Sequence, residues 1–160
     1  MEINVWEQVI KKLQNENKTI SAMESCTGGG LANEITNISG ASEVLKESYV
    51  TYCNEAKIKH GVPKEIIEKH TVYSIETAVA MAKAMQNKTG ADFSIGITGM
   101  LGRVDPLNPV DNINCVWYAI SDRNKNVIAR EIKVKDVNRK EQKEIVINEV
   151  AKTLLEIQDA

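Results

Sequence analysis

The sequence predicts an α/β fold, in which a mixed, mostly parallel sheet has helices on both faces. Helical and strand patterns alternate along the 160 residues, as expected for strands joined by helical connections. The turn at residues 122–126 separates two strand patterns, and it is the one clear signal for an antiparallel hairpin. With 42% hydrophobic residues and no linker or low-complexity tract, residues 1–160 are expected to form a single domain.

The first half of the chain begins with two helix and strand patterns in alternation. Apolar residues recur at helical spacing over residues 4–15, which predicts an amphipathic helix leading into a strand at 19–23. A glycine-rich turn follows, and the next helix is expected over residues 28–36. A second strand is predicted at about residues 47–52, where the side chains alternate.

Capping residues indicate where the central helices begin and end. Asn54 is the expected N-cap of a short helix, because its side chain can accept hydrogen bonds from the first free amides. Pro63 suits the first turn of another short helix at 64–69. Ser74 can cap a longer helix that Gly90 terminates.

The last part of the chain contains three strand patterns, a long connection and a final helix. A strand at 92–97 leads into an irregular segment at 98–114, which is long enough to form one wall of a site. Strands at 116–121 and 127–134 flank the hairpin turn, and a helix is predicted over 138–157.

Composition excludes several classes of partner. The net charge is -2 and the lysines and arginines are not clustered, so nucleic-acid binding is disfavoured. The apolar segments are too short to span a bilayer, and the N-terminus lacks the pattern of a signal peptide. We therefore expect a soluble cytoplasmic protein with no membrane partner.

The cysteines and histidines do not form a recognisable ligand set. Cys26, Cys53 and Cys115 make an odd number without a C-x-x-C pair, which disfavours a disulfide framework. Their spacing to His60 and His70 resembles no structural zinc motif, so we expect no metal. Both histidines follow helical segments rich in charge, where a solvated or C-capping side chain is the ordinary outcome.

The most informative segment is the glycine turn at residues 24–30, between a strand pattern and a helix pattern. Such a turn is expected to leave backbone amides free at the helix N-terminus, where an anion or an oxyanion can bind. Ser25 and Cys26 lie beside those amides, and either is a potential nucleophile. We predict the active site here, although a serine before glycines is often only a helix cap.

Three segments together resemble the CinA C-terminal domain family, which includes nicotinamide-nucleotide amidohydrolases. They are Glu-Ser-Cys-Thr-Gly-Gly at 24–29, Tyr-Cys-Asn-Glu-Ala-Lys at 52–57 followed by Gly-Val-Pro at 61–63, and Ile-Thr-Gly at 97–99. The resemblance implies a three-layer α/β/α domain that converts nicotinamide mononucleotide to nicotinate mononucleotide and ammonia in pyridine nucleotide salvage. It implies no metal and no organic cofactor, and we expect a small-molecule nucleotide substrate and a homo-oligomer.

The resemblance also implies a catalytic set, in which Ser25 is the nucleophile and Lys57 and Tyr52 assist it. Amide hydrolysis needs a nucleophile, a base for its proton and donors for the oxyanion. A lysine in a dry pocket, one helical turn after the Asn54 cap, has a lowered proton affinity and can accept the serine proton. Tyr52 is expected at the end of the preceding strand, where it could relay a proton or orient the pair. The alternatives are a solvated lysine and a tyrosine that only packs.

Further residues are expected to contact the substrate. Thr98 and Gly99 follow a strand toward its C-terminal end, where ligands gather in open α/β sheets, although a simple turn would also require the glycine. For the phosphate, the glycine-turn amides and the basic start of the last helix are the available donors, and Arg139 is the best single choice. The predicted substrate-binding residues are Thr27, Gly28, Gly29, Asn54, Thr98, Gly99 and Arg139.

Two alternatives remain beside the serine hydrolase. The Cys26 thiol could attack instead, but no histidine lies in a comparable motif, so we expect a packed thiol. Family members usually continue after Thr-Gly into a glycine-rich loop, whereas this chain has Leu101, Arg103 and Asp105 there. Bulk at these positions favours altered activity or substrate choice, or a catalytically impaired module that binds a nucleotide or a partner. A phosphotransfer protein ranks last, because no P-loop lysine follows Gly30.

Overall fold

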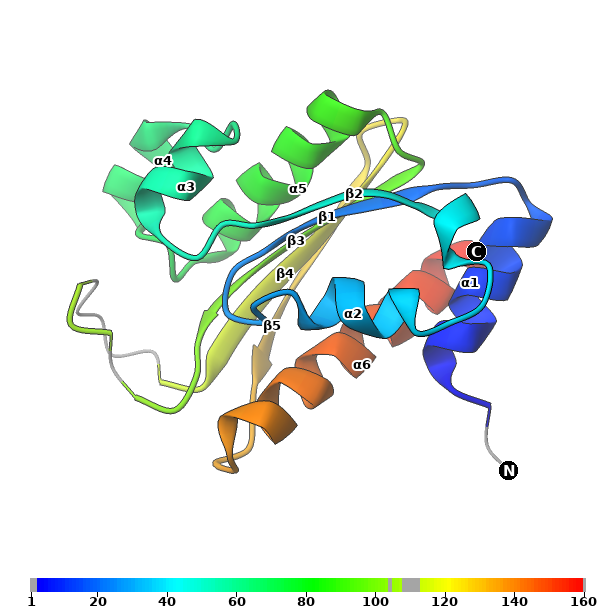
Figure 1. Cartoon of the computed structure of the whole chain (residues 1–160). Helices are drawn as coiled ribbons and strands as arrows, with labels where there is room; N and C mark the ends of the chain where they lie inside the picture. Colours follow the sequence, from blue (N-terminus) through cyan, green and yellow to red (C-terminus); the bar gives the residue numbers. More distant parts are fainter. Residues whose placement is uncertain (1–2, 104, 108–112, 160) are drawn as a thin grey trace.

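The computed structural model describes residues 3–103, 105–107 and 113–159, and it contains a five-stranded sheet between two layers of helices (Figure 1). The strand order is β2-β1-β3-β4-β5. The strands are β1 (Ile20–Glu24), β2 (Leu45–Val50), β3 (Phe93–Met100), β4 (Cys115–Asp122) and β5 (Val127–Lys133). The predicted α/β fold is therefore confirmed.

The sheet is mixed: β1 is parallel to both of its neighbours, β2 and β3, and β4 is antiparallel to both of its neighbours, β3 and β5. Parallel pairings therefore do not outnumber antiparallel ones, which differs from the expected balance. Met100 pairs with Cys115, so the connection between β3 and β4 joins adjacent strand ends and the chain reverses direction. The hairpin predicted at residues 122–126 joins β4 to β5.

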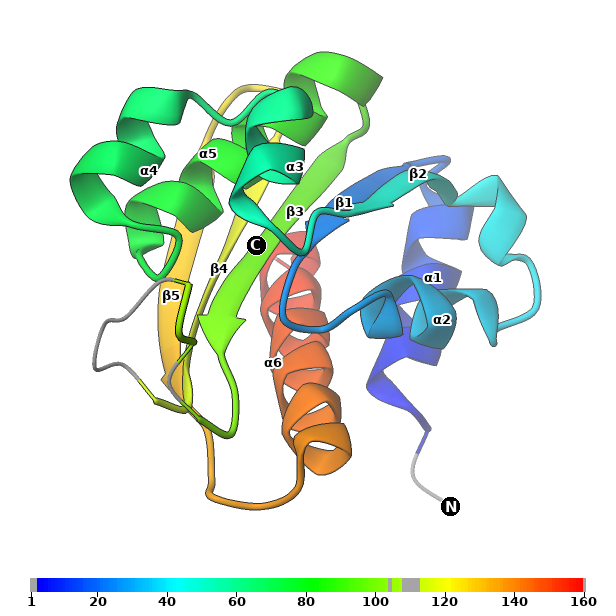
Figure 2. The ribbon, with the colours of Figure 1, turned by 60° about the vertical axis from the view of Figure 1, so that its left-hand side comes forward.

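The helices cover both faces of the sheet, as the three-layer prediction requires (Figures 1 and 2). On one face lie α1 (Val5–Asn15), α2 (Gly30–Thr36) and α6 (Arg139–Asp159). On the other face lie α3 (Asn54–Lys59), α4 (Lys64–His70) and α5 (Ile75–Thr89). No helix in the described ranges is long and apolar enough to cross a bilayer.

The core is divided by the sheet, which is why its central strands are apolar on both faces. Between the sheet and α1, α2 and α6, the largest cluster includes Trp6, Leu13 and Leu154, all fully buried. On the other face α5 packs closely on β3, where a Cβ at Gly96 would lie 2.4 Å from the Ala78 carbonyl oxygen. Glycine at this position is thus required by the approach of the helix to the strand.

Several predicted helix ends are confirmed and others are wrong. Ser74 caps α5, since its Oγ accepts the Thr77 amide at 3.2 Å, and Gly90 ends that helix in the left-handed region. Asn54 is the first residue of α3 rather than its cap, which is Cys53. The sequence analysis also missed the short 3-10 helix η1 (Ala41–Glu43).

The strand limits change where the predicted site residues lie. Strand β3 continues to Met100, so Thr98 and Gly99 are inside the strand and paired with β4. Strand β2 ends at Val50, so Tyr52 lies in the segment that follows it. The error has a simple cause, because a glycine inside a strand has the same local pattern as a turn glycine.

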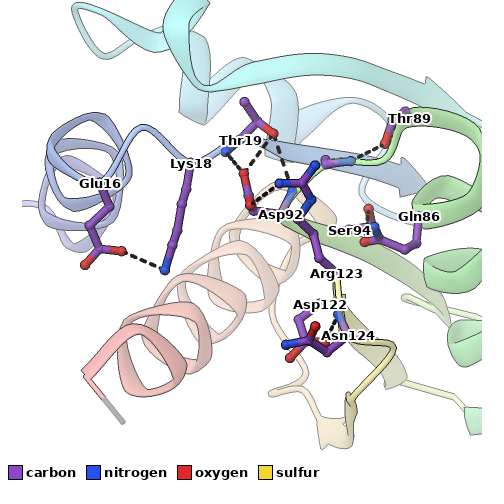
Figure 3. A network of polar contacts seen from close by, with 11 residues as sticks. Glu16, Lys18, Thr19, Gln86, Thr89, Asp92, Ser94, Asp122, Arg123 and Asn124 are labelled. Carbon is purple, nitrogen blue, oxygen red and sulfur yellow. Dashed lines mark hydrogen bonds and ion pairs between the residues drawn. The ribbon is translucent and has the colours of Figure 1, made fainter.

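At the other end of the sheet, a polar network fixes where β1 and β3 begin (Figure 3). The Thr19 amide donates to Asp92 Oδ2 at 2.8 Å, and the Arg123 guanidinium lies 3.5 Å from the same carboxylate. Ser94 in β3 donates to Gln86 in α5 at 3.2 Å. These contacts hold the strand starts together, far from the C-terminal ends that carry the glycine turn.

Candidate active site

Ser25 lies in the turn between β1 and α2, directly after the C-terminal end of β1. Its amide donates to the Ile97 carbonyl oxygen at 3.1 Å, so the start of the turn, just after the end of β1, is attached to β3. Gly28 and Gly29 have φ angles of 59° and 95°, which ordinary side chains rarely adopt. The glycines therefore allow the chain to leave β1 and enter α2 within a few residues, and this places Ser25 at the edge of a cavity.

Lys57 in α3 contacts Ser25 directly. Its side chain is 1% exposed, and its Nζ donates to Ser25 Oγ at 2.9 Å and to the Thr51 carbonyl oxygen at 2.7 Å. The Thr51 amide donates in turn to the Glu24 carbonyl oxygen at 2.8 Å. A closed set of contacts thus joins the end of β1 to the segment that carries Lys57, and it brings two of the predicted residues together.

Burial lowers the pKa of the Lys57 amine to about 8, although Cys26, Cys53 and Asp105 oppose the change. The sequence analysis attributed a lowered pKa partly to a helix N-terminus. Lys57 instead lies toward the end of the six-residue helix α3, and desolvation is the cause. An amine with such a pKa, 2.9 Å from a hydroxyl, has the geometry and the proton affinity of a general base.

The first amides of α2 are not free, which corrects the expectation of an open anion site. The Glu24 carboxylate is fully buried and accepts the amides of Leu31 at 2.8 Å and Ala32 at 3.2 Å. It also accepts the Thr27 hydroxyl at 2.6 Å. A ligand phosphate therefore cannot use these amides, and Glu24 instead stabilises the helix end that follows Ser25.

The cavity in front of Ser25 has a volume of about 420 Å³. Its walls come from the segment after β2, the connection before α5, the segment after β3 and the start of α6. Within the predicted wall at residues 98–114, Leu101, Arg103 and Asp105 line the cavity. Positions 104 and 108–112 of this predicted wall lie outside the described residues.

The predicted substrate-binding residues separate into two groups. Asn54, Gly99 and Arg139 line the cavity. Thr98 is buried and its hydroxyl donates to the Val72 carbonyl oxygen at 2.6 Å, so its visible role is to hold the connection before α5. The residues of the first group are thus placed to meet a ligand.

The remaining predicted binding residues lie in the glycine turn, behind Ser25. Thr27 is fully buried and its hydroxyl is bonded to Glu24. Gly28 lies beside α6, where a Cβ would be 3.8 Å from Lys143 Nζ. Gly29 lies beside β2, where a Cβ would be 3.5 Å from a Val50 methyl carbon. Their visible contribution is the shape of the turn.

Tyr52 lines the cavity, and its hydroxyl is bonded to the start of α6. Its side chain is 60% exposed, and its hydroxyl accepts a hydrogen bond from Arg139 Nη2 at 3.1 Å. This contact joins the segment after β2 to the start of α6 across the mouth of the cavity. The expected relay to Lys57 has no hydrogen bond in the described part of the chain, and Tyr52 is placed to orient Arg139 instead.

Comparison with known proteins shows the family to which the chain belongs. Residues 2–158 match the model of the CinA C-terminal domain. The chain belongs to this family. A CinA-like protein from Kosmotoga olearia is 42% identical over 102 residues, covering 63% of this chain and 25% of that protein. One from Chlorobium chlorochromatii is 38% identical over 128 residues, covering 79% of this chain and 30% of that protein. The CinA domain thus spans about a quarter to a third of these relatives.

Solved structures of the superfamily have the same fold. The competence/damage inducible protein CihA from Agrobacterium tumefaciens superposes with a TM-score of 0.85 at 27% identity, over 100% of both chains. A CinA superfamily protein from Klebsiella pneumoniae superposes with a TM-score of 0.87 at 22% identity, over 97% of this chain and 96% of that one. The arrangement of layers in the CinA domain is therefore that of its superfamily.

The thiols and histidines of the CinA domain have contacts of their own. Burial raises the pKa of the Cys26 thiol to about 12, so its nucleophilic thiolate form is suppressed. His60 stacks on Tyr49 at 4.7 Å between ring centroids, and His70 lies 3.6 Å from Glu76. Within the described residues no group of three or more His, Cys, Asp or Glu side chains could hold a metal ion.

Two cavity residues escaped the sequence analysis. Tyr73, in the connection between α4 and α5, lines the cavity and its hydroxyl donates to Asp105 Oδ2 at 2.6 Å. Cys53 is exposed and also lines the cavity, beside the segment that carries Lys57. A tyrosine outside the recognised segments has no local signal, since only the packing of α5 on the sheet brings it to this place.

Proposed function

We propose that the CinA domain is an amidohydrolase that converts nicotinamide mononucleotide to nicotinate mononucleotide and ammonia. The observation that carries the proposal is the 2.9 Å contact between Lys57 Nζ and Ser25 Oγ at the wall of a cavity. Serine with lysine is an established pairing for acyl transfer, because a neutral amine can remove the hydroxyl proton. The two relatives are named only as CinA-like proteins and CihA only as competence/damage inducible, so these names specify neither a substrate nor a reaction.

In the proposed reaction Lys57 takes the proton of Ser25 as Oγ attacks the carboxamide carbon. The amide of Cys26 follows the nucleophile directly, and the residue lines the cavity, so it is our candidate donor for the oxyanion. The tetrahedral intermediate then expels ammonia, with the proton returned from Lys57, and leaves an ester on Ser25. A water molecule, deprotonated by Lys57, hydrolyses that ester and releases the nicotinate carboxylate.

The cavity is suited to a mononucleotide in size and lining. Its volume of about 420 Å³ falls in the range of about 300 to 1,000 Å³ usual for small-molecule sites. Tyr52 and Tyr73 provide aromatic surface for a ring, and Arg139 provides a fork of donors for a phosphate. With the α2 amides occupied by Glu24, the guanidinium is the better candidate for the phosphate.

The test is incubation of the purified protein with nicotinamide mononucleotide, with ammonia and nicotinate mononucleotide both quantified. We expect Ser25→Ala to reduce turnover by several orders of magnitude, while Cys26→Ala, the matched neighbouring variant, largely retains it. Turnover that depends on Cys26 and not on Ser25 would show that the nucleophile is assigned wrongly. Wild-type protein that binds the nucleotide without releasing ammonia would instead identify a nucleotide-binding module.

A further inference from the structure

The cavity in front of Ser25 contains a carboxylate that is held in place from two sides. Asp105 Oδ2 accepts the Tyr73 hydroxyl at 2.6 Å, and Asp105 Oδ1 accepts the Leu107 amide at 2.9 Å. Asp105 and Tyr73 both line the cavity. Because both carboxylate oxygens are engaged, the negative charge has a defined position in the cavity wall.

Tyr73 is itself fixed by the connection that carries it. Thr71 has a φ of 63°, and its carbonyl oxygen accepts the Thr77 hydroxyl at 2.6 Å and the Ser74 hydroxyl at 3.0 Å. This connection is thereby attached to the first turn of α5, which packs on the central strands. The Tyr73 hydroxyl is therefore a stationary donor, and Asp105 is bound to the rigid side of the cavity.

The carboxylate shares its cavity with Ser25 and Cys26. Its charge acts on the Lys57 ammonium and raises the pKa of Lys57 against the effect of burial. Tyr73 lines this cavity as well. Asp105 and Tyr73 thus line the same cavity as Ser25, where the reacting amide of a substrate would be.

Among the residues that the structure describes, the other charged side chains lining the cavity are Glu55, Arg103 and Arg139. Arg103 and Asp105 both lie in the segment that follows β3. The cavity thus has two carboxylates, of which Tyr73 holds Asp105 in a fixed position, and two guanidinium groups. Such a combination suits a ligand with one cationic group and one doubly anionic group.

We propose that Asp105, held by Tyr73, makes the cavity select the oxidised pyridinium form of a nicotinamide mononucleotide over its neutral dihydropyridine form. The inference rests on the proposed function, which places the carboxamide, and therefore its ring, at Ser25. The oxidised ring carries a positive charge and the reduced ring carries none, while the phosphate is the same in both. The carboxylate consequently stabilises one form only, and Asp105 determines specificity without taking part in the bond changes.

The experiment compares binding of the two forms to the full chain in a Ser25→Ala background, which prevents turnover. Dissociation constants are measured by calorimetry at pH 7.5. We expect the oxidised form to bind about tenfold more tightly than the reduced form, the ratio that corresponds to about 1.4 kcal/mol. Adding Asp105→Asn, which keeps the size of the side chain, should bring the ratio of the two dissociation constants to about one, because only the binding of the oxidised form becomes weaker.

Two further variants separate charge from support of the loop. Glu43→Gln removes one exposed carboxylate in η1, at the other end of β2, and should leave the ratio unchanged. Tyr73→Phe removes the hydroxyl that holds Asp105, and should reduce the ratio without abolishing it. If Asp105→Asn weakens both forms equally, or if the starting protein binds both equally or neither, the inference is wrong.

Turnover of the two forms by the wild-type chain distinguishes this inference from the proposed function. Ammonia release with equal kcat/KM for both forms would overturn the inference and leave the amidohydrolase standing. Selective binding of the oxidised form by a protein that releases no ammonia would support the selectivity and overturn the amidohydrolase. In that case Asp105 would be a specificity residue of a nucleotide-binding module.

Discussion

Replacement of Lys57 by methionine tests the proposed base and the cost of its burial together. Methionine has a similar length and no charge, so Lys57→Met should keep the packing of α3 while removing the amine 2.9 Å from Ser25. We expect kcat/KM to fall by about 10²- to 10⁴-fold, the usual range for a general base. In the wild type, activity should rise with pH and level off above about 8, as Lys57 loses its proton.

The effect on stability follows from the same pKa. Unfolded Lys57 has a pKa of 10.5 and folded Lys57 one of about 8, so the folded state binds fewer protons between these values. Below pH 8 this costs about 3 kcal/mol of stability, which is recovered as the pH rises toward 10.5. Lys57→Met removes that cost but also two hydrogen bonds worth about 1 kcal/mol each. We therefore expect the variant to be more stable than the wild type by about 1 kcal/mol at pH 7.

Urea unfolding followed by tryptophan fluorescence measures the difference, because Trp6 and Trp117 are both buried. The advantage of Lys57→Met should shrink by about 2 kcal/mol between pH 7 and pH 10 and change sign. Lys57→Arg is the matched control, since it keeps the charge at all accessible pH values. A stability difference that does not depend on pH would refute the argument from burial, and full activity in Lys57→Met would refute the role as base.

The remaining predictions concern three other parts of the site. Glu24→Gln should lower the free energy of unfolding by about 1 to 3 kcal/mol, because the glutamine side chain has one acceptor oxygen where the carboxylate uses two to accept hydrogen bonds from the backbone of α2. Equal stability of the variant and the wild type in urea unfolding would count against this. Iodoacetamide at pH 8 should alkylate exposed Cys53 well before buried Cys26, as peptide mass mapping can show; the reverse order would contradict the raised pKa of Cys26. Arg139→Met should raise KM for the mononucleotide about tenfold or more with a smaller change in kcat, and a change in kcat alone would remove Arg139 from the phosphate.

Local features of the chain were predictable because they depend on backbone conformation over a few residues. The turn after β1 needs glycines at Gly28 and Gly29, and that requirement is visible in the sequence. The Ser74 cap and the Gly90 stop of α5 follow equally local rules. Where a strand and a loop share the same local pattern, as at Gly99, the prediction of the boundary was wrong.

The direction of side chains across the site was not predictable from the same patterns. Glu24 has the same position in the motif whether its carboxylate points to solvent or into the first turn of α2. Tyr52 lies in the expected segment, yet its hydroxyl contacts Arg139, 87 residues further along the chain. These side-chain directions depend on which helices pack beside the turn, and the periodicity of the sequence does not predict them.

The sequence by itself thus determined the α/β class, the turn that presents Ser25, and the helix that carries Lys57. These depend on hydrophobic periodicity and on the restricted φ angles of a few residues. Only the tertiary structure decided that Lys57 is buried against Ser25 and that Glu24 occupies the α2 amides. It alone joined Tyr73 to Asp105, 32 residues apart. Desolvation and long-range contacts exist only once the layers have packed, so the chemistry of the site is a property of the fold.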